Sequence, residues 1–285
     1  MNKIRIITDS ACDIPVKTKL KNTEILGFYI TIDGKSYEER KDFTNKEFYR
    51  ILEDCTEIPA TAHITMMRFG ERIEYYYKKG VEDIIIVTIN GSGSATYNAA
   101  IMAKDMFFEE NPDAKIHIHI IDSQCYSIGY GYPVMVADEM VENGVDAQEI
   151  VDFLIDSFEN RQILLATYSL RFMKKSGRIS RRASFAGEML GLKPIILMDH
   201  GKTSVLKKVR GDKMVIPGLI DTFKQLSGDY KNYIIAYTDE EYGKELYSAC
   251  KKELGAAPLM SVELGCAVSA NAGNHCVGIV FTGKK

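Results

Sequence analysis

The sequence has no tryptophan, no long hydrophobic run and no excess of basic residues. No stretch approaches the roughly 18 apolar residues that a membrane-spanning helix needs. Lys and Arg total 36 against 39 Asp and Glu, a formal net charge of −3, whereas a nucleic-acid-binding domain usually carries a basic surface. We therefore expect neither stable membrane insertion nor general nucleic-acid binding.

Cysteines are few and lack the spacing of a metal site. The six occur singly, without a Cys-x-x-Cys pair, at positions 12, 55, 125, 250, 266 and 276. The N-terminus runs directly into a strand-like pattern instead of the apolar stretch of a secretory signal. Because disulfides persist in oxidising compartments, these features predict reduced thiols and a cytoplasmic protein. We expect no metal site and no cofactor.

Strand-like and helix-like segments alternate along the first half of the chain, which is typical of βαβ units around a parallel sheet. After residue 160 the pattern changes, and a hairpin is expected around residues 199–202. The sequence therefore predicts an α/β protein. A three-layer domain with a parallel sheet occupies residues 1–160, a smaller α/β domain occupies 161–285, and the ligand lies between or beside them.

The expected elements follow from apolar periodicity and from cap and turn residues. Strands are expected at 4–8, 25–32, 84–89, 115–121, 163–167, 194–198, 203–209, 233–238, 259–263 and 277–282. Helices are expected after a capping box at Thr44 and Glu47, and at 66–79, 94 onward, 128–143, 147–160, 170–175, 183–190, 213–226 and 240–254.

One stretch, residues 83–100, organises the prediction of function. Residues 84–89 are almost continuously apolar and mostly β-branched, which suits a strand buried on both faces. Small residues at 90–93 break the strand, and from Ser94 the composition becomes helical. A strand that ends in such a turn and opens a helix aims backbone N–H groups at one point, and such a point binds an anion. The alternative is an ordinary turn in which Ser94 is only the N-cap of the helix.

Known nucleotide-binding and hydrolase motifs do not fit this turn. Gly91-x-Gly93-x-x-Thr96 lacks the third glycine of the dinucleotide fingerprint, and no acidic residue ends a strand about 20 positions later. The Gly-Lys-Ser/Thr of a P-loop is absent, and the glycines of a nucleophile elbow are replaced by Asn90 and Ser94. A carboxylate or phosphate held by Ser94 and the helix amides fits these residues better.

Three other groups of polar residues suggest chemistry. Asp9 and Asp122 end strands and could hold Mg²⁺ for phosphoryl transfer, although Asp is also a common helix cap and turn residue. His117 and His119 share one face of a strand, but no third metal ligand accompanies them. A basic cluster faces either solvent or an acidic partner or anion; it comprises Lys174, Lys175, Arg178, Arg181 and Arg182.

Five segments, taken in order, resemble the motifs of one family. They are Ile-Thr-Asp-Ser-Ala-Cys-Asp-Ile-Pro at 7–15, Ser-Ala-Thr-Tyr-Asn-Ala-Ala at 94–100, Ile-Asp-Ser at 121–123, Leu-Arg-Phe-Met-Lys-Lys-Ser-Gly-Arg-Ile-Ser at 170–180 with Leu-Lys-Pro-Ile-Ile at 192–196, and Gly-Ile-Val-Phe at 278–281. Through them the chain resembles the DegV family of bacterial fatty-acid-binding proteins over essentially its whole length.

The resemblance implies the EDD fold, in which two α/β domains enclose a long-chain acyl group such as palmitate. It implies carboxylate contacts from Thr61 and Ser94, with Thr96 in the same turn, and it places Arg178 nearby or on a partner-facing rim. It also implies that the bound fatty acid is presented to a separate kinase, which makes acyl phosphate for phospholipid synthesis.

The chain departs from the family pattern at two places. Residues 61–65 read Thr-Ala-His-Ile-Thr where the family has Thr-Ser-Gln-Pro-Ser, so one hydroxyl is missing. Asn271 stands where the family has a histidine that donates to the carboxylate, and an asparagine can donate a hydrogen bond but cannot carry charge. His275 is the alternative donor.

Three functions remain open from the sequence. The first is a non-catalytic carrier that holds a long-chain fatty acid in an apolar tunnel, which the lack of a convincing nucleophile or metal set favours. The second is a Mg²⁺-dependent hydrolase or phosphotransferase that uses Asp9 and Asp122. The third is a regulator that binds another protein through the basic cluster around Arg178.

Overall fold

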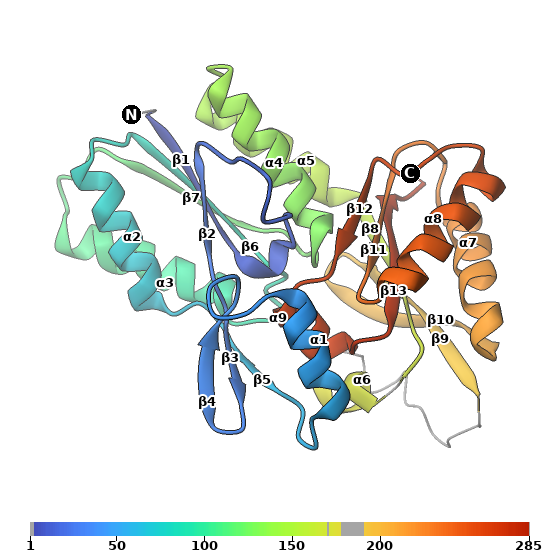
Figure 1. Cartoon of the computed structure of the whole chain (residues 1–285). Coiled ribbons are helices and arrows are strands. Elements are labelled where there is room, and N and C mark those ends of the chain that lie inside the picture. Colours follow the sequence, from blue (N-terminus) through green and yellow to red (C-terminus); the bar gives the residue numbers. More distant parts are fainter. Residues whose placement is uncertain (1–2, 170, 178–190, 285) are drawn as a thin grey trace.

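A computed structural model describes residues 3–169, 171–177 and 191–284 of the chain. The predicted helix at 183–190 and the predicted site residue Arg178 lie outside these ranges, as do Arg181 and Arg182. Within them, no helix is long and apolar enough to cross a membrane. Two large sheets and one small sheet form the framework (Figure 1).

The first sheet is parallel and is built from the first half of the chain. Its strands, in spatial order, are β2 (Thr23–Leu26), β1 (Ile4–Asp9), β6 (Asp83–Thr88) and β7 (His117–Asp122). Two pairs of helices enclose it, α2 (Met66–Lys78) with α3 (Thr96–Glu110), and α4 (Ile128–Glu142) with α5 (Ala147–Glu159) (Figure 1). Ile84–Val87 of the central strand are fully buried. The predicted three-layer arrangement around a parallel sheet is therefore confirmed.

The second sheet has six strands and lies beside the first. Its order is β10 (Lys202–Arg210), β9 (Leu192–Asp199), β8 (Arg161–Thr167), β13 (Cys276–Thr282), β11 (Tyr233–Tyr237) and β12 (Met260–Glu263). The pairing is antiparallel except between β11 and β12. Helices α7 (Val215–Leu226), preceded by the short η3 (Asp212–Met214), and α8 (Glu240–Leu254) cover one face. The predicted hairpin at 199–202 is confirmed.

Alternation along the strands gives the second sheet two different faces. Leu164, Ile235 and Ile279 pack in one core with residues of α7 and α8. Their neighbours in the chain, such as Leu165, Ala236 and Val280, point to the other face, because successive side chains of a strand alternate. That second face is turned toward the first half of the chain, where it forms part of a cavity.

A small third sheet corrects the prediction of one long strand over residues 25–32. The chain breaks at Gly27, so that β2 joins the first sheet while β3 (Tyr29–Ile32) pairs with β4 (Lys35–Glu38) and β5 (Ala60–Ala62). A Cβ at Gly27 would lie 2.7 Å from the carbonyl oxygen of Glu39, so only glycine fits at this crossing. The break depends on a residue distant in sequence, which periodicity cannot show.

Helix α1 (Asn45–Asp54) joins the small sheet to the C-terminal half of the chain. Its Thr44 and Glu47 form the predicted capping box. Phe48 and Leu52 of α1 pack with Phe172 of α6 (Arg171–Ser176) and with Cys266 and Ala270 of α9 (Cys266–Ala272). This core contains residues from both sides of position 160, and the division into domains at that position stays a prediction.

Candidate ligand cavity

A cavity of about 510 Å³ lies between the two large sheets and beside the small one. Its size is in the range of about 300–1,000 Å³ that is usual for small-molecule sites. The first half of the chain contributes to the walls the turn after β6, the start of α3, and β5 with the residue after it. The second half contributes α9 and the face of the second sheet that α7 and α8 do not cover. Polar residues of the wall include Thr61, His63, Ser92, Ser94, Asn98, Ser176 and Asn271.

The rest of the wall is mainly apolar. It includes Ile163 and Leu165 of β8, Val280 of β13 and Ala236 of β11, all on the face of the sheet that the helices leave uncovered. Further apolar wall residues are Phe28, Ile89, Met173, Met198, Leu264, Ala267, Val268 and Ala272. Among the described residues the wall contains no Lys, Arg, Asp or Glu. The cavity therefore suits a ligand that is largely hydrocarbon with a small polar group.

The turn after β6 is held rigidly by its own hydrogen bonds. The Oδ1 atom of Asn90 accepts hydrogen bonds from the backbone N and the hydroxyl of Ser92, at 3.1 and 3.0 Å. The N–H of Gly91 donates to Asp122 Oδ1 at 2.9 Å, and the N–H of Gly93 donates to the carbonyl of Asn90 at 3.0 Å. The N–H groups of Gly91, Ser92 and Gly93 are therefore engaged within the protein. Binding of an anion by the amides at the start of the helix stays a prediction.

Ser94, at the end of the turn, offers its hydroxyl to the cavity. Its hydroxyl oxygen accepts a hydrogen bond from the N–H of Thr96 at 3.3 Å and lies 2.9 Å from the Thr96 hydroxyl. The N-cap of α3 is Ala95, so the interpretation of Ser94 as N-cap is one residue off. If the Thr96 hydroxyl donates to Ser94, the Ser94 proton is left for a ligand.

The structure brings some of the predicted site residues together and separates others. Thr61, Ser94 and Asn271 all line the cavity. Thr96 is fully buried and supports Ser94 from behind, and it is not part of the wall. His275 is also outside the wall: its Nδ1 lies 3.7 Å from Asp239 Oδ2, and its ring meets the ring of Tyr242 edge-on.

Sequence reasoning missed His63 and Asn98 as cavity residues. His63 follows Thr61 by two positions, so the alternation along a strand would have placed both on one side. Asn98 follows Ser94 by four positions, the spacing of one helical turn. Both signals are present in the sequence, although neither shows by itself that the segment borders a cavity.

Helix α9 is fixed against the first half of the chain by buried carboxyl groups. Glu39 accepts hydrogen bonds from the Ser10 hydroxyl and from the backbone N of Ala267, the second at 2.8 Å. Asp13 accepts a hydrogen bond from the Ser127 hydroxyl. Burial raises the pKa of Glu39 and holds the pKa of Asp13 well above its ordinary value. Because Ser127 and Ala267 line the cavity, this cluster supports its wall.

The carboxyl group of Asp9 lies deeper in the same region. It accepts hydrogen bonds from Ala11 N at 3.2 Å, Ile89 N at 2.8 Å and the Tyr130 hydroxyl at 2.5 Å. It is the N-cap of the short helix η1 (Ser10–Cys12). Burial raises the pKa of Asp9 to about 7, and the hydrogen bonds oppose that shift. The interpretation of Asp9 as a cap is therefore confirmed.

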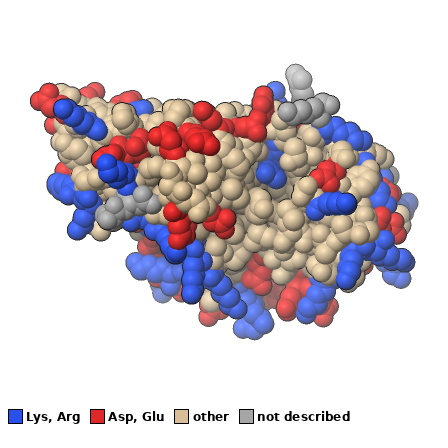
Figure 2. All heavy atoms as spheres, turned by 90° about the horizontal axis from the view of Figure 1, so that it is seen from above, with Lys and Arg blue, Asp and Glu red and all other residues tan. Residues whose placement is uncertain are grey.

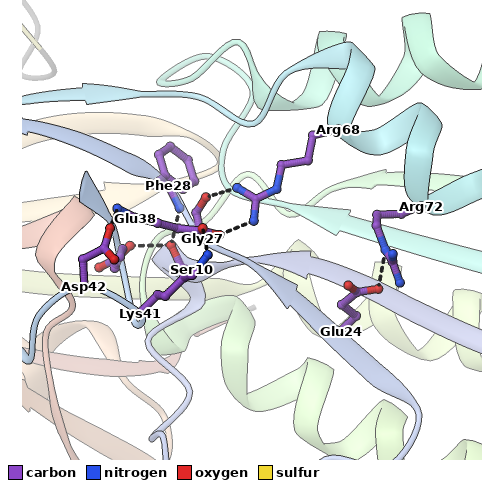
Figure 3. A network of polar contacts seen from close by, with 10 residues as sticks. Ser10, Glu24, Gly27, Phe28, Glu38, Lys41, Asp42, Arg68 and Arg72 are labelled. Atoms are coloured by element: carbon purple, nitrogen blue, oxygen red, sulfur yellow. Dashed lines mark hydrogen bonds and ion pairs between the residues drawn. The ribbon is translucent and has the colours of Figure 1, made fainter. Parts of the chain in front are cut away.

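An ion pair on α2 holds the small sheet beside the cavity (Figure 3). Arg68 donates to the carbonyl of Gly27 at 2.7 Å and also pairs with Glu38 of β4. The Phe28 N–H donates to Ser10 Oγ at 2.9 Å. Because Phe28 is a wall residue, these contacts keep that side of the cavity in place.

The tip of the β9–β10 hairpin is attached to the turn after β6. The carbonyl oxygen of Gly201 accepts a hydrogen bond from Asn90 Nδ2 at 2.9 Å and lies 3.0 Å from the Ser92 hydroxyl, whose one proton is shared between this oxygen and Asn90 Oδ1. The N–H of Gly201 donates to the carbonyl of Gln124 at 2.9 Å. Gly201 has a φ of +70° and a Cβ there would lie 2.7 Å from Asn90 Oδ1, so this position requires glycine. The hairpin thereby joins the two halves of the chain beside the cavity, to whose wall its residues Met198 and Thr203 contribute.

The residues considered for metal chemistry are engaged elsewhere. Asp122 accepts hydrogen bonds from the N–H groups of Gly91 and Gln124, both at 2.9 Å. His117 and His119 lie 3.2 and 3.6 Å from Asp83 Oδ1. In the part of the chain that the structure describes, no three His, Cys, Asp or Glu side chains are grouped to hold a metal ion.

One part of the outer surface of the first half carries a group of acidic side chains. The helix α5 exposes Glu149, Asp152, Asp156 and Glu159, and Figure 2, which looks down on the side where α4 and α5 lie, shows acidic side chains grouped together. Such a surface repels anionic surfaces. The cavity wall is formed by other elements.

Comparison with known proteins agrees with this architecture. A family model described as an uncharacterised protein of the DegV family matches residues 3–284. A DegV domain-containing protein of Caldanaerobacter subterraneus is 31% identical over 288 residues, which cover 100% of both chains.

Solved structures with the same fold include two from the genus Eubacterium. A stearic acid-binding protein of Eubacterium ventriosum is 23% identical, covers 97% of each chain and has a TM-score of 0.85. A DegV family protein of Eubacterium eligens, loaded with heptadecanoic acid, is 22% identical, covers 99% of this chain and 100% of its own, and has a TM-score of 0.81. With the match of the family model to nearly every residue and the full-length relative, these similarities establish that this chain belongs to the DegV family.

Proposed function

We propose that this protein binds a long-chain fatty acid without catalysing a reaction on it. The observation that carries the proposal is the cavity of about 510 Å³, whose wall joins hydroxyl and amide side chains to an apolar sheet face. The fold of proteins that bind stearic and heptadecanoic acid supports the same class of ligand.

The hydrocarbon supplies most of the affinity. Sixteen buried methylenes contribute about 13 kcal/mol before the costs of association, at about 0.8 kcal/mol each. The carboxylate then needs only a few aligned donors. We assign these to Thr61 and Ser94, with Asn271 as the third group on the same wall. Thr96 acts through Ser94, and Arg178 stays a predicted contact.

The proposal extends to the protein's role in the cell. A carrier that holds an acyl chain and keeps its carboxyl near solvent suits a second enzyme that modifies the carboxyl. We propose a fatty acid kinase as that enzyme, with acyl phosphate for phospholipid synthesis as its product, and the cytoplasm as the location. Six free thiols support a reducing compartment.

Two experiments test the proposal. Mass spectrometry of an organic extract of the purified protein should detect long-chain fatty acid in near-stoichiometric amount. The variant Ser94→Ala should bind added palmitate about tenfold more weakly, because hydrogen bonds to charged groups are worth about 1.5–3 kcal/mol. Ser248→Ala, an exposed serine on α8, is the matched control. Protein that is repeatedly empty and has no affinity for palmitate would refute the proposal.

A further inference from the structure

His63 is the one basic side chain in the described wall of the cavity. The chain has five histidines, and the other four lie outside that wall. His63 is exposed although it borders the cavity, so it stands where the cavity meets solvent. It follows directly after β5, two positions beyond Thr61. A titratable group is therefore present beside a hydroxyl that we have assigned to the carboxylate.

We propose that His63 determines the preference of the cavity for a carboxylate and makes binding depend on pH. This inference rests on the proposed function and deepens it. A protonated imidazole is a charged donor, and the wall supplies no other cation among the described residues. A histidine changes charge between about pH 5 and 8, where a fatty acid carboxyl in water is already ionised. Affinity for the carboxylate should rise as the pH falls through the range in which a histidine side chain gains its charge.

The other charged and titratable groups near His63 would not make carboxylate binding depend on pH in the same range. In the described part of the wall the other titratable side chain is Tyr126, whose hydroxyl accepts a hydrogen bond from Asn90. The neighbouring elements β3, β5 and α9 carry no charged residue. Glu38 of β4 is paired with Arg68, which lies near the start of α2, the helix that follows His63. The nearby helix α6 carries Arg171, Lys174 and Lys175. Arginine and lysine stay protonated over the range in which a histidine titrates.

The experiment compares palmitate with hexadecanol, which has the same chain and no charge, at pH 8 and pH 6. The wild-type protein should bind palmitate about two- to fivefold more tightly at pH 6 than at pH 8, because an exposed ion pair contributes an affinity change of that size. It should bind hexadecanol equally tightly at the two pH values. In His63→Gln the affinity for palmitate should no longer depend on pH. In His63→Lys the affinity for palmitate should be high at pH 6 and at pH 8. His117→Gln, which alters an exposed histidine at the far end of β7, should behave as wild type.

The outcomes separate this inference from the proposed function. A wild-type protein that binds neither palmitate nor hexadecanol refutes the proposed function itself. A protein that binds palmitate with no pH dependence, or whose pH dependence survives in His63→Gln, overturns the role of His63 and leaves fatty-acid binding intact.

Discussion

The side chain of Asn90 joins the two halves of the chain by donating to the carbonyl oxygen of Gly201 at 2.9 Å. The same side chain shapes the turn before Ser94 through its Oδ1 atom. One buried side-chain amide thus positions the turn before Ser94 and attaches the tip of the β9–β10 hairpin to it.

Replacing Asn90 should therefore affect stability and ligand exchange together. Asn90→Ala removes the hydrogen bonds to Gly201, Tyr126 and Ser92, and it should lower the free energy of unfolding by about 1–3 kcal/mol. The hairpin tip is then held less firmly, so bound palmitate should leave several-fold faster. Urea unfolding and stopped-flow displacement measure the two effects. A lower free energy of unfolding without faster release of palmitate would show that the hairpin does not control exit.

The hydroxyl of Thr96 should matter although it does not reach the cavity. Thr96→Val keeps the shape of the buried side chain and removes the group that supports Ser94. Palmitate binding should weaken about fivefold, the equivalent of one ordinary hydrogen bond of about 1 kcal/mol. Thr96→Ser restores the hydroxyl and should recover most of the affinity in a titration. Equal affinity in the valine and serine variants would mean that Ser94 needs no orientation.

Asp9 should make the stability of the protein fall as the pH rises. Its pKa is raised by burial to about 7, whereas an unfolded aspartate has a pKa of about 3.9. Between these values the folded protein keeps a proton that the unfolded chain has lost, so the free energy of unfolding decreases from about pH 4 to about pH 7.

The variant Asp9→Asn tests this, because an amide does not titrate. It should be less stable overall, since it replaces an acceptor of three hydrogen bonds, and its loss of stability from pH 4.5 to pH 7 should be smaller than that of wild type. Part of the loss should remain, because burial also raises the pKa of Asp13 and Glu39. Asp156→Asn, on the exposed face of α5, is the control. Stability that increases over this range in wild type would contradict the prediction.

Filling the cavity from its apolar sheet wall should shift the preferred acyl length. Ala236 of β11 lines the cavity from the sheet face, and Ala236→Leu adds three carbon atoms there. Binding of palmitate should weaken relative to that of a shorter acid such as laurate, at about 0.8 kcal/mol for each methylene that is displaced. Ala249→Leu, on α8 beyond the other face of the sheet, should leave the order of affinities unchanged. An unchanged order in Ala236→Leu would place the acyl chain elsewhere.

The elements that the sequence predicts well are those set by local patterns. The apolar run at 84–89, the capping box of Thr44 and the turn at 199–202 each contain their whole signal within a few residues. The break at Gly27 does not, because it depends on Glu39 and Arg68. Residues 25–32 therefore read as one continuous apolar strand, although the structure divides them between two sheets.

The site shows the same limit. Ser94 and Asn271 come to one cavity from segments far apart, and the sequence suggested this through a family resemblance, without any pattern that joins them. Thr96 was expected at the ligand and lies behind Ser94, because the helix begins one residue later than its composition suggests. His63 was overlooked, since a segment of three strand residues carries too little periodicity to show which side faces a cavity.

The packing of α1 on α9 has a consequence for synthesis of the protein. Phe48 and Leu52 leave the ribosome well before Cys266 and Ala270, which pack against them and follow more than 200 residues later in the chain. The nascent chain must therefore carry an apolar helix surface exposed until α9 has been synthesised, which makes α1 a natural binding site for chaperones.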